Sequence, residues 1–158
     1  IGILADGIGS TELAFLPYRS DPLVLICPPH HRLAKKRSVQ FADTLDENFI
    51  SLGADSPTHA LLCEQAREAG RPVRIRAQLR SFSAICRMVA TGIGIALVPR
   101  SVVAATGQAA ELAQRPLAES WADRGMKLCF RRDADTPAAQ QELLAFLTLA
   151  SAGPDQRR

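Results

Sequence analysis

The amino-acid sequence predicts an α/β fold that contains parallel strands. Between residues 49 and 98, segments with strand character alternate with segments whose apolar residues recur at helical spacing. The order is strand, helix, strand, helix, strand, which favours a parallel layer with right-handed crossovers. A second observation is the wholly apolar run Leu23–Cys27, which needs cover on both faces. A third is a pair of glycines that follows a helical pattern instead of preceding one.

The first part of the chain predicts three extended segments. Ile1–Leu4 indicates a buried strand that leads into a polar, glycine-containing turn at residues 6–11. Leu13–Leu16 and Leu23–Cys27 indicate two further strands, and a pair of prolines ends the later one. Residues 28–37 are then expected to form a loop.

The next segments predict a strand, a turn and a helix. Phe49–Leu52 indicates a short strand, and Gly53–Thr58 has the composition of a strand-to-helix turn. Asp55 or Ser56 can cap the helix that follows, and Pro57 suits the first position of that helix. The helix is predicted over Pro57–Ala69 and ends at a Gly-Arg-Pro sequence.

The second half of this region predicts another strand, helix and strand. Val73–Leu79 alternates with a period of two, which is typical of a strand with one solvated face. Apolar residues then recur at helical spacing between about Ser81 and Thr91. Ile95–Val98 indicates a short buried strand.

Gly92 and Gly94 lie between this helix and the last strand. A dinucleotide-binding fingerprint needs a strand before its glycines and a helix after them. Here the helix comes first, and Gly92 falls where a left-handed C-terminal cap is expected. The glycines therefore end a helix and do not hold a phosphate.

The last third of the chain is patterned only in part. Residues 101–117 carry a weak pattern, and Met126–Phe130 indicates a strand. Thr136 and Pro137 open a final helix, and residues 153–158 are expected to be a frayed tail. The predicted buried stripe of the final helix consists of Ala139, Leu143, Phe146, Leu147 and Ala150.

Composition excludes several classes of protein. Of the 158 residues, 47% are hydrophobic and 22% are charged, which is ordinary for a globular protein. No run approaches the roughly 20 apolar residues of a membrane span. Nineteen basic and sixteen acidic residues leave a net charge of +3, and the basic residues are scattered. With one Trp and one Tyr, the chain itself is not expected to bind nucleic acid.

The four cysteines are far apart and contain no C-x-x-C pattern, so reduced thiols are expected. The first residues contain no charged segment followed by an apolar one, so nothing marks export, and a cytoplasmic protein is expected. The chain begins abruptly with strand-like residues. This start predicts that the natural protein contains earlier residues.

Three segments, taken in order, resemble LysR-type transcriptional regulators. Asp21–Ala34, with the sequence DPLVLICPPHHRLA, resembles the strand and loop that cross between the two effector-binding subdomains of that family. Met88–Pro99 resembles its helix end, glycine turn and strand, and Met126–Arg131 followed by Thr136–Leu147 resembles its return strand and closing helix. His31 departs from the proline that the family often carries after its histidine.

The resemblance implies a periplasmic-binding-protein-like fold of type II. Two Rossmann-like subdomains would be joined by two crossing strands, with the ligand in the cleft. Residues 1–27 and 126–150 would belong to subdomain I, residues 28–125 to subdomain II, and residues 151–158 to a disordered tail. Family members begin with a winged helix-turn-helix domain that binds DNA, a linker helix and the first half of subdomain I. None of these is in this chain, so subdomain I is expected to be incomplete and to expose apolar surface.

The resemblance also implies homodimers that build tetramers. A small-molecule effector, expected to be a carboxylate or another anion, would change the relative angle of the subdomains and hence the spacing of the attached DNA-binding domains. Activation or repression, and the controlled genes, stay open.

Two turns are the candidate effector site. Gly53–Thr58 and Arg80–Ser83 each follow a predicted strand and precede a helix, so they offer backbone N–H groups, hydroxyls and a positive helix end. Arg80 could contact a carboxylate and Phe82 could form an apolar wall. The candidate residues are Leu52, Gly53, Ala54, Asp55, Ser56, Pro57, Arg80, Ser81, Phe82 and Pro99.

Each of these residues also has a purely structural interpretation. Ser56 and either Ser81 or Ser83 are suited to cap helices, Arg80 to end a strand in solvent, and Phe82 to lie in the core. For any single residue we favour capping or packing over ligand contact.

Two other functions were weighed. An enzyme or metal centre could be imagined from Cys27, His30, His31 and Cys63, but Cys27-x-x-His30 is a single half-site, and the histidine pair lies in a basic loop that is more naturally solvated. His59 is expected at the surface. No metal, cofactor or catalytic residue is predicted. An extracytoplasmic solute-binding protein would share the fold, and upstream sequence would separate it from the regulator. The regulator is favoured because the resembling segments follow that family's order and because four unpaired cysteines suit a reducing compartment.

Overall fold

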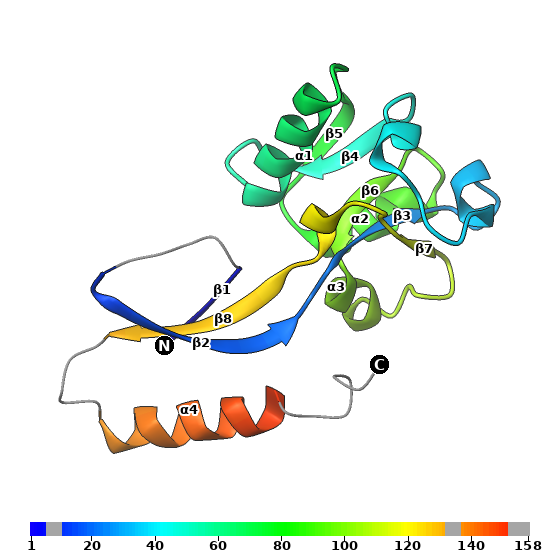
Figure 1. Cartoon of the computed structure of the whole chain (residues 1–158). Coiled ribbons are helices and arrows are strands. Elements are labelled where there is room, and N and C mark those ends of the chain that lie inside the picture. Colours follow the sequence, from blue (N-terminus) through cyan, green and yellow to red (C-terminus); the bar gives the residue numbers. More distant parts are fainter. Residues whose placement is uncertain (6–10, 132–136, 152–158) are drawn as a thin grey trace. The chain divides into compact units, whose positions relative to one another are not determined.

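The computed structural model describes residues 1–5, 11–131 and 137–151. The chain forms two compact units (Figure 1): Ile1–Asp21 with Arg124–Arg158, called unit 1, and Pro22–Asp123, called unit 2. The predicted turn at 6–11 lies outside the described residues except for Thr11, and so does the tail at 151–158 except for Ser151. Among the described residues, no helix is long and apolar enough to cross a membrane.

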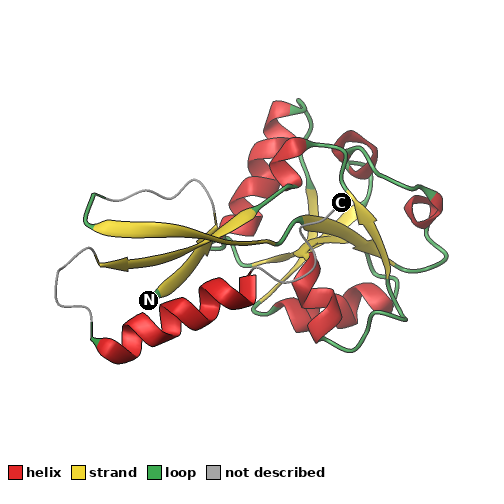
Figure 2. Cartoon of the chain, turned by 60° about the horizontal axis from the view of Figure 1, so that its bottom comes forward, coloured by secondary structure: helices red, strands yellow, loops and turns green. Residues whose placement is uncertain are grey.

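Unit 1 is a three-stranded antiparallel sheet with one helix. Its strands are β1 (Gly2–Ala5), β8 (Gly125–Arg131) and β2 (Leu13–Ser20), in the order β1-β8-β2. The helix α4 (Ala138–Ser151) lies beside this sheet and contacts β2 (Figure 2). The strand β2 is longer than predicted, because it continues through an irregularity between Pro17 and Arg19.

Unit 1 leaves much apolar surface exposed. The prediction that Leu143 and Phe146 lie on a buried stripe of α4 is wrong, because their exposed fractions are 47% and 67%. In the described part of the chain, only β2 lies against this helix with more than marginal contact. Of the seven exposed large hydrophobic residues in the described ranges, six belong to this unit: Ile1, Ile3, Leu16, Leu143, Phe146 and Leu149.

Unit 2 contains parallel and antiparallel strands. The predicted parallel pairing is confirmed for β4 (Asn48–Leu52) and β5 (Arg74–Leu79), and Phe49 also forms a parallel bridge with Ile95. The apolar strand β3 (Leu23–Cys27) is different, because both of its neighbours are antiparallel. These neighbours are β6 (Ala96–Pro99) and β7 (Ala113–Pro116).

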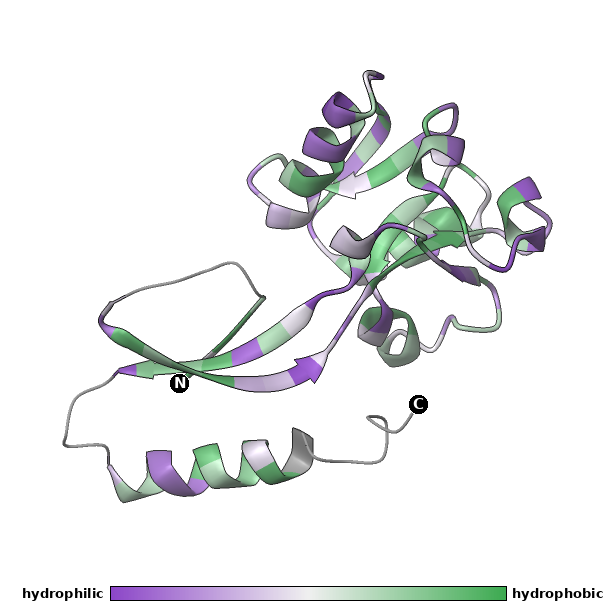
Figure 3. Ribbon diagram, viewed as in Figure 1, coloured by the Kyte–Doolittle hydropathy of each residue, from purple (hydrophilic) through white to green (hydrophobic). Residues whose placement is uncertain are grey.

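The strand β3 is hydrophobic in Figure 3 and is buried on both faces, as predicted. Successive side chains of a strand point to opposite faces, so Leu25 and Cys27 join one core cluster while Val24 and Ile26 join another. The helix α1 (Pro57–Glu68) contributes to the first cluster and α2 (Phe82–Ala90) to the second. Two helices on opposite faces therefore supply the cover that an apolar strand requires.

The helix ends follow the predicted chemistry. Ser56 caps α1 by accepting a hydrogen bond from the N–H of Thr58, and Pro57 occupies the first turn. The helix α2 ends at Ala90, and Gly92 has a φ of 84°, in the left-handed region that favours glycine. The strand β6 follows, so the predicted role of these glycines is confirmed.

Several short elements were not predicted. In the weakly patterned stretch after residue 100, the structure has α3 (Arg100–Ala105) and β7, and the loop after β3 contains the 3-10 helices η1 (Arg32–Lys35) and η2 (Phe41–Thr44). A third 3-10 helix, η3, covers Ser120–Ala122. The compact units divide after Asp21 rather than at residue 27, because β3 pairs within unit 2. The assignment of the units to subdomains I and II stays a prediction.

Candidate functional site

A pocket of about 560–610 Å³ is found at each end of α1, and the one at its N-terminal end contains most of the predicted site. The parallel strands β4 and β5 end there side by side, because Leu52 is the register partner of Leu79. Carboxyl ends of parallel strands are where open α/β sheets bind ligands. This pocket, of about 610 Å³, is lined by Leu52, Gly53, Asp55, Ser56, Pro57, Leu79 and Arg80.

Hydroxyl groups in the two turns are engaged as helix caps. The Oγ of Ser56 accepts from the N–H of Thr58 at 3.2 Å, and the Oγ of Ser81 accepts from the N–H of Ala84 at 3.3 Å. The hydroxyls of Ser81 and Ser83 are also 3.2 Å apart. Because capping uses an acceptor lone pair, the Ser56 Oγ–H keeps its capacity to donate to a ligand.

Arg80 and Asp55 set the charge of the pocket. Arg80 is exposed, and within the described ranges its guanidinium takes part in no hydrogen bond or ion pair. The Asp55 carboxylate lies close to Gly53, since a Cβ added at Gly53 would come within 2.8 Å of Asp55 Oδ1. A bound anion would face this carboxylate, so it needs the Arg80 guanidinium as its counter-charge.

Four predicted residues do not line the pocket. Ala54 and Ser81 are exposed beside it, and Phe82 packs against the second core cluster. Pro99 is buried and is the register partner of Leu23. The residue that sequence reasoning missed is Leu79, although its position before Arg80 at a strand end was visible in the alternating pattern.

Two of the three histidines differ from expectation. His30 is exposed, as expected, but His31 is half-buried: its Nδ1 accepts from the N–H of Leu33 and its Nε2 lies 3.3 Å from Glu47 Oε2. His59, expected at the surface, is half-buried and hydrogen-bonded to Ser51. Within the described ranges, no group of three or more His, Cys, Asp or Glu residues could hold a metal ion.

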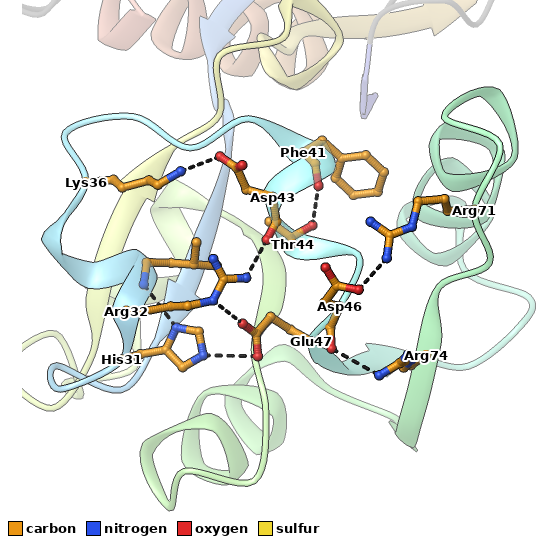
Figure 4. A network of polar contacts seen from close by, with 11 residues as sticks. His31, Arg32, Lys36, Phe41, Asp43, Thr44, Asp46, Glu47, Arg71 and Arg74 are labelled. Atoms are coloured by element: carbon orange, nitrogen blue, oxygen red, sulfur yellow. Dashed lines mark hydrogen bonds and ion pairs between the residues drawn. The ribbon is translucent and has the colours of Figure 1, made fainter.

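Figure 4 shows the polar network around His31, which ties the loop after β3 together. The Arg32 guanidinium donates to Glu47 Oε1 and to the carbonyl oxygen of Asp43, both at 2.7 Å. Lys36 donates to the Asp43 carboxylate at 2.5 Å, and this bond lowers the pKa of Asp43. The charged loop is therefore held in place by its own side chains.

The same network continues toward α1 and β5. Arg71, in the loop between them, donates to the Asp46 carboxylate, and this hydrogen bond lowers the pKa of Asp46. Arg74 donates to the carbonyl oxygen of Asp46 at 3.3 Å. These contacts connect loops of unit 2.

Comparisons with known proteins show what this chain is similar to. The model of the LysR substrate binding domain matches residues 1–151. A probable RuBisCO transcriptional regulator of Cyanophora paradoxa is 34% identical over 96 residues, which cover 59% of this chain and 30% of that protein. The chain spans less than half the length of the curated relatives that it matches.

Two solved structures have the same fold. The CcmR regulatory domain of Synechocystis PCC6803, in complex with 2-PG, has a TM-score of 0.84 and 24% identity, and the match covers 96% of this chain and 73% of that one. The effector binding domain of QuiR, in complex with shikimate, has a TM-score of 0.74 and 20% identity. The match covers 94% of this chain and 71% of that one.

Proposed function

This chain belongs to the LysR substrate binding domain family, and from that premise we propose that it is the effector-binding and oligomerisation domain of a LysR-type transcriptional regulator. The relatives are named as transcriptional regulators, which supports this function over that of a transporter's solute-binding protein. A regulator of this kind needs no catalytic residue and no cofactor. It would act on DNA in the cytoplasm through a separate winged helix-turn-helix domain.

The proposed effector is a small anion that binds in the pocket lined by Ser56 and Arg80. The observation that carries this proposal is an unpaired guanidinium beside a helix N-terminus, at the carboxyl ends of two parallel strands. A backbone N–H at the start of α1 and the Ser56 Oγ–H complete the donors for an acidic group. The ligands named for the CcmR and QuiR structures, 2-PG and shikimate, also support a small-molecule effector.

The effector is proposed to act by shifting a conformational equilibrium. An anion that binds one arrangement of the two units more tightly stabilises that arrangement by its difference in affinity. The attached DNA-binding domains would then change their spacing. Homodimers and tetramers are the proposed assemblies, and the exposed apolar residues of unit 1 support them.

A calorimetric titration tests the pocket. The full-length protein is titrated with 2-PG, shikimate, inorganic phosphate and a panel of small carboxylates, first unchanged and then with Arg80→Gln. We expect at least one anion to bind, and the substitution to weaken it about tenfold or more, since a hydrogen bond to a charged group contributes about 1.5–3 kcal/mol.

Arg76→Gln is the matched control. Arg76 is an exposed arginine of β5, the strand that ends just before Arg80, and it does not line the pocket; its substitution changes the net charge equally. The Arg76→Gln protein should bind the anion with the same binding constant as the unchanged protein. Equal weakening by both substitutions would show that only overall charge attracts the anion, and binding of none of the anions would overturn the proposed effector class.

A further inference from the structure

A polar cluster lies between α1 and the two parallel strands, and none of its members lines the proposed effector pocket. Its members are His59 and Cys63 on α1, Ser51 on β4 and Gln78 on β5. His59 and Cys63 are four residues apart, so they lie on one face of the helix. Ser51 and Gln78 are register partners in the parallel pair, so their side chains approach the same imidazole.

The imidazole connects a thiol to an orienting group. Cys63 Sγ lies 3.4 Å from His59 Nε2, within hydrogen-bonding reach for sulfur. On the other side of the ring, Ser51 Oγ lies 2.9 Å and the Gln78 side-chain amide 3.5 Å from Nδ1. A nucleophile, a base in contact with it and a third group that orients the base together form the arrangement of an activated nucleophile.

The hydrogen bond to Ser51 is compatible with removal of the thiol proton, and the Gln78 amide fits the same tautomer when its oxygen rather than its nitrogen faces Nδ1. When Nδ1 carries the hydrogen and donates it to Ser51 Oγ, Nε2 is an acceptor for the Cys63 S–H. Transfer of that proton to Nε2 leaves a thiolate beside an imidazolium whose second N–H is still held by Ser51. Ser51 has an exposed fraction of only 5%, so its hydroxyl is a fixed partner.

The thiol is accessible from a second pocket. This pocket, of about 560 Å³, lies at the C-terminal end of α1, whereas the proposed effector pocket lies at the N-terminal end. It combines an apolar surface with two guanidinium groups. Its lining residues are Cys63, Ala66, Arg67, Gly70, Arg71, Pro72 and Val73.

The two arginines of this pocket have different roles. Arg71 is engaged by the Asp46 carboxylate. Arg67 is exposed, and in the part of the chain that the structure describes its guanidinium forms no hydrogen bond or ion pair. Arg67 is therefore the cation that remains to attract a negatively charged molecule toward the thiol.

The other cysteines lack these features. Cys27 and Cys86 have no exposed surface and Cys129 has 8%. Burial raises the pKa of Cys27 to about 11 and also raises the pKa of Cys86, which keeps both as inert thiols. The reactivity of Cys63 can therefore be compared with that of three buried cysteines in the same chain.

We propose that Cys63 is a nucleophilic thiol with His59 as its base, and that the adjoining pocket admits small anionic carbon electrophiles, such as α,β-unsaturated carboxylates, that modify it covalently. In the reaction, the Cys63 proton moves to His59 Nε2 and the sulfur electron pair forms a bond to the β-carbon. The carbon–carbon π bond breaks, and the resulting carbanion takes the proton from His59. The product is a thioether, and no oxidant or reductant is consumed.

Alkylation rates at each cysteine test the base. The native chain is treated with iodoacetamide or with iodoacetate, and the modification of each cysteine is followed by mass spectrometry. Cys63 should react first with both reagents, and His59→Gln should slow its reaction by about tenfold or more, because a positioned base typically contributes at least that much. Continued protection of Cys27 and Cys86 reports that the variant is folded.

The charge of the reagent tests the pocket. Arg67→Gln should lower the rate ratio of iodoacetate to iodoacetamide at Cys63 by about twofold to fivefold, whereas Arg76→Gln should leave it unchanged. An unaltered Cys63 rate in a folded His59→Gln chain would overturn the role of His59. A ratio that Arg67→Gln does not change would overturn the preference for anions.

Discussion

Gly92 and Gly94 are two residues apart and are required for different physical reasons. At Gly92 the backbone has a φ of 84°, and an added Cβ would meet open space. At Gly94 no positive φ is found, but an added Cβ would overlap the carbonyl oxygen of Asn48. That oxygen accepts the N–H of Ile95, one of the bonds that join β4 to the chain before β6.

Substitution by alanine should separate the two reasons. Gly92→Ala is expected to lower the free energy of unfolding by about 1 kcal/mol through conformational strain alone. Gly94→Ala is expected to cost more, about 2–3 kcal/mol, because the backbone itself must shift. Urea denaturation of both variants measures the difference.

Gly70→Ala serves as the control for strain, since Gly70 has a φ of 69° and also faces open space. It should resemble Gly92→Ala. If Gly94→Ala were no more destabilising than these two variants, the close approach to Asn48 would not be what requires a glycine there.

At the scale of elements, acidic residues of the η2 region form ion pairs that connect this region to the loops before and after it. Asp43 is bound by Lys36 after η1, and Asp46 by Arg71 before β5. Both carboxylates have a pKa below the ordinary value of 3.8, mainly because each accepts a hydrogen bond from its cation. The charged form of each is therefore favoured in the folded state.

This sign determines how stability depends on pH. A carboxylate whose pKa is lowered by folding contributes stability above its unfolded pKa and loses it as the pH falls through the folded pKa. Stability should thus decline below about pH 4, and less steeply in the double variant Asp43→Asn, Asp46→Asn. Both pairs are exposed to solvent, so the effect should be small and weaken at high salt.

Chemical denaturation between about pH 6 and pH 3 measures this slope. Asp123→Asn removes one carboxylate charge, half of what the double variant removes, from an exposed residue that forms no ion pair within the described ranges. The free energy of unfolding of Asp123→Asn should depend on pH more steeply than that of the double variant. Equal slopes for the unchanged chain and the double variant would rule out these two pairs as its source.

At the scale of the whole molecule, the two units have different amounts of core. Both large clusters of buried hydrophobic residues lie within unit 2. Unit 1 instead exposes apolar side chains on its sheet and on α4. Exposed apolar surface of this kind is typical of an interface.

A fragment of residues 22–123 should therefore fold without unit 1. We expect one cooperative thermal transition and a monomer in sedimentation, whereas the whole chain should associate. Phe146→Ser together with Leu149→Ser should weaken that association, since both side chains are more than 60% exposed, at 67% and 76%. A fragment that does not unfold cooperatively, or an association that the double substitution leaves intact, would contradict this division.

Local patterns determined the elements whose signals lie within one segment. The caps of α1 and α2, the left-handed Gly92 and the apolar run of β3 were all readable from neighbouring residues. The short β7 and α3 were not, because their stability comes from pairing with β3 and packing against α2 and β6 rather than from their own composition.

The candidate site shows the same limit. Its turn residues were found because strand ends and helix caps have local signatures, whereas Phe82 and Pro99 were included although packing and strand pairing occupy them. The cluster around His59 was missed because Ser51, Cys63 and Gln78 are brought together only by helix packing and strand register.

By itself, the amino-acid sequence determined the order of the longer helices and strands, the role of the glycine turn and the family resemblance, since each depends on residues close together along the chain. Only the tertiary structure decided that β3 is antiparallel to both neighbours, that Arg80 lines a pocket with Ser56, and that Cys63 meets His59 above two strands. The physical reason is that hydrogen-bond register and side-chain packing depend on residues distant in sequence, which no local pattern records.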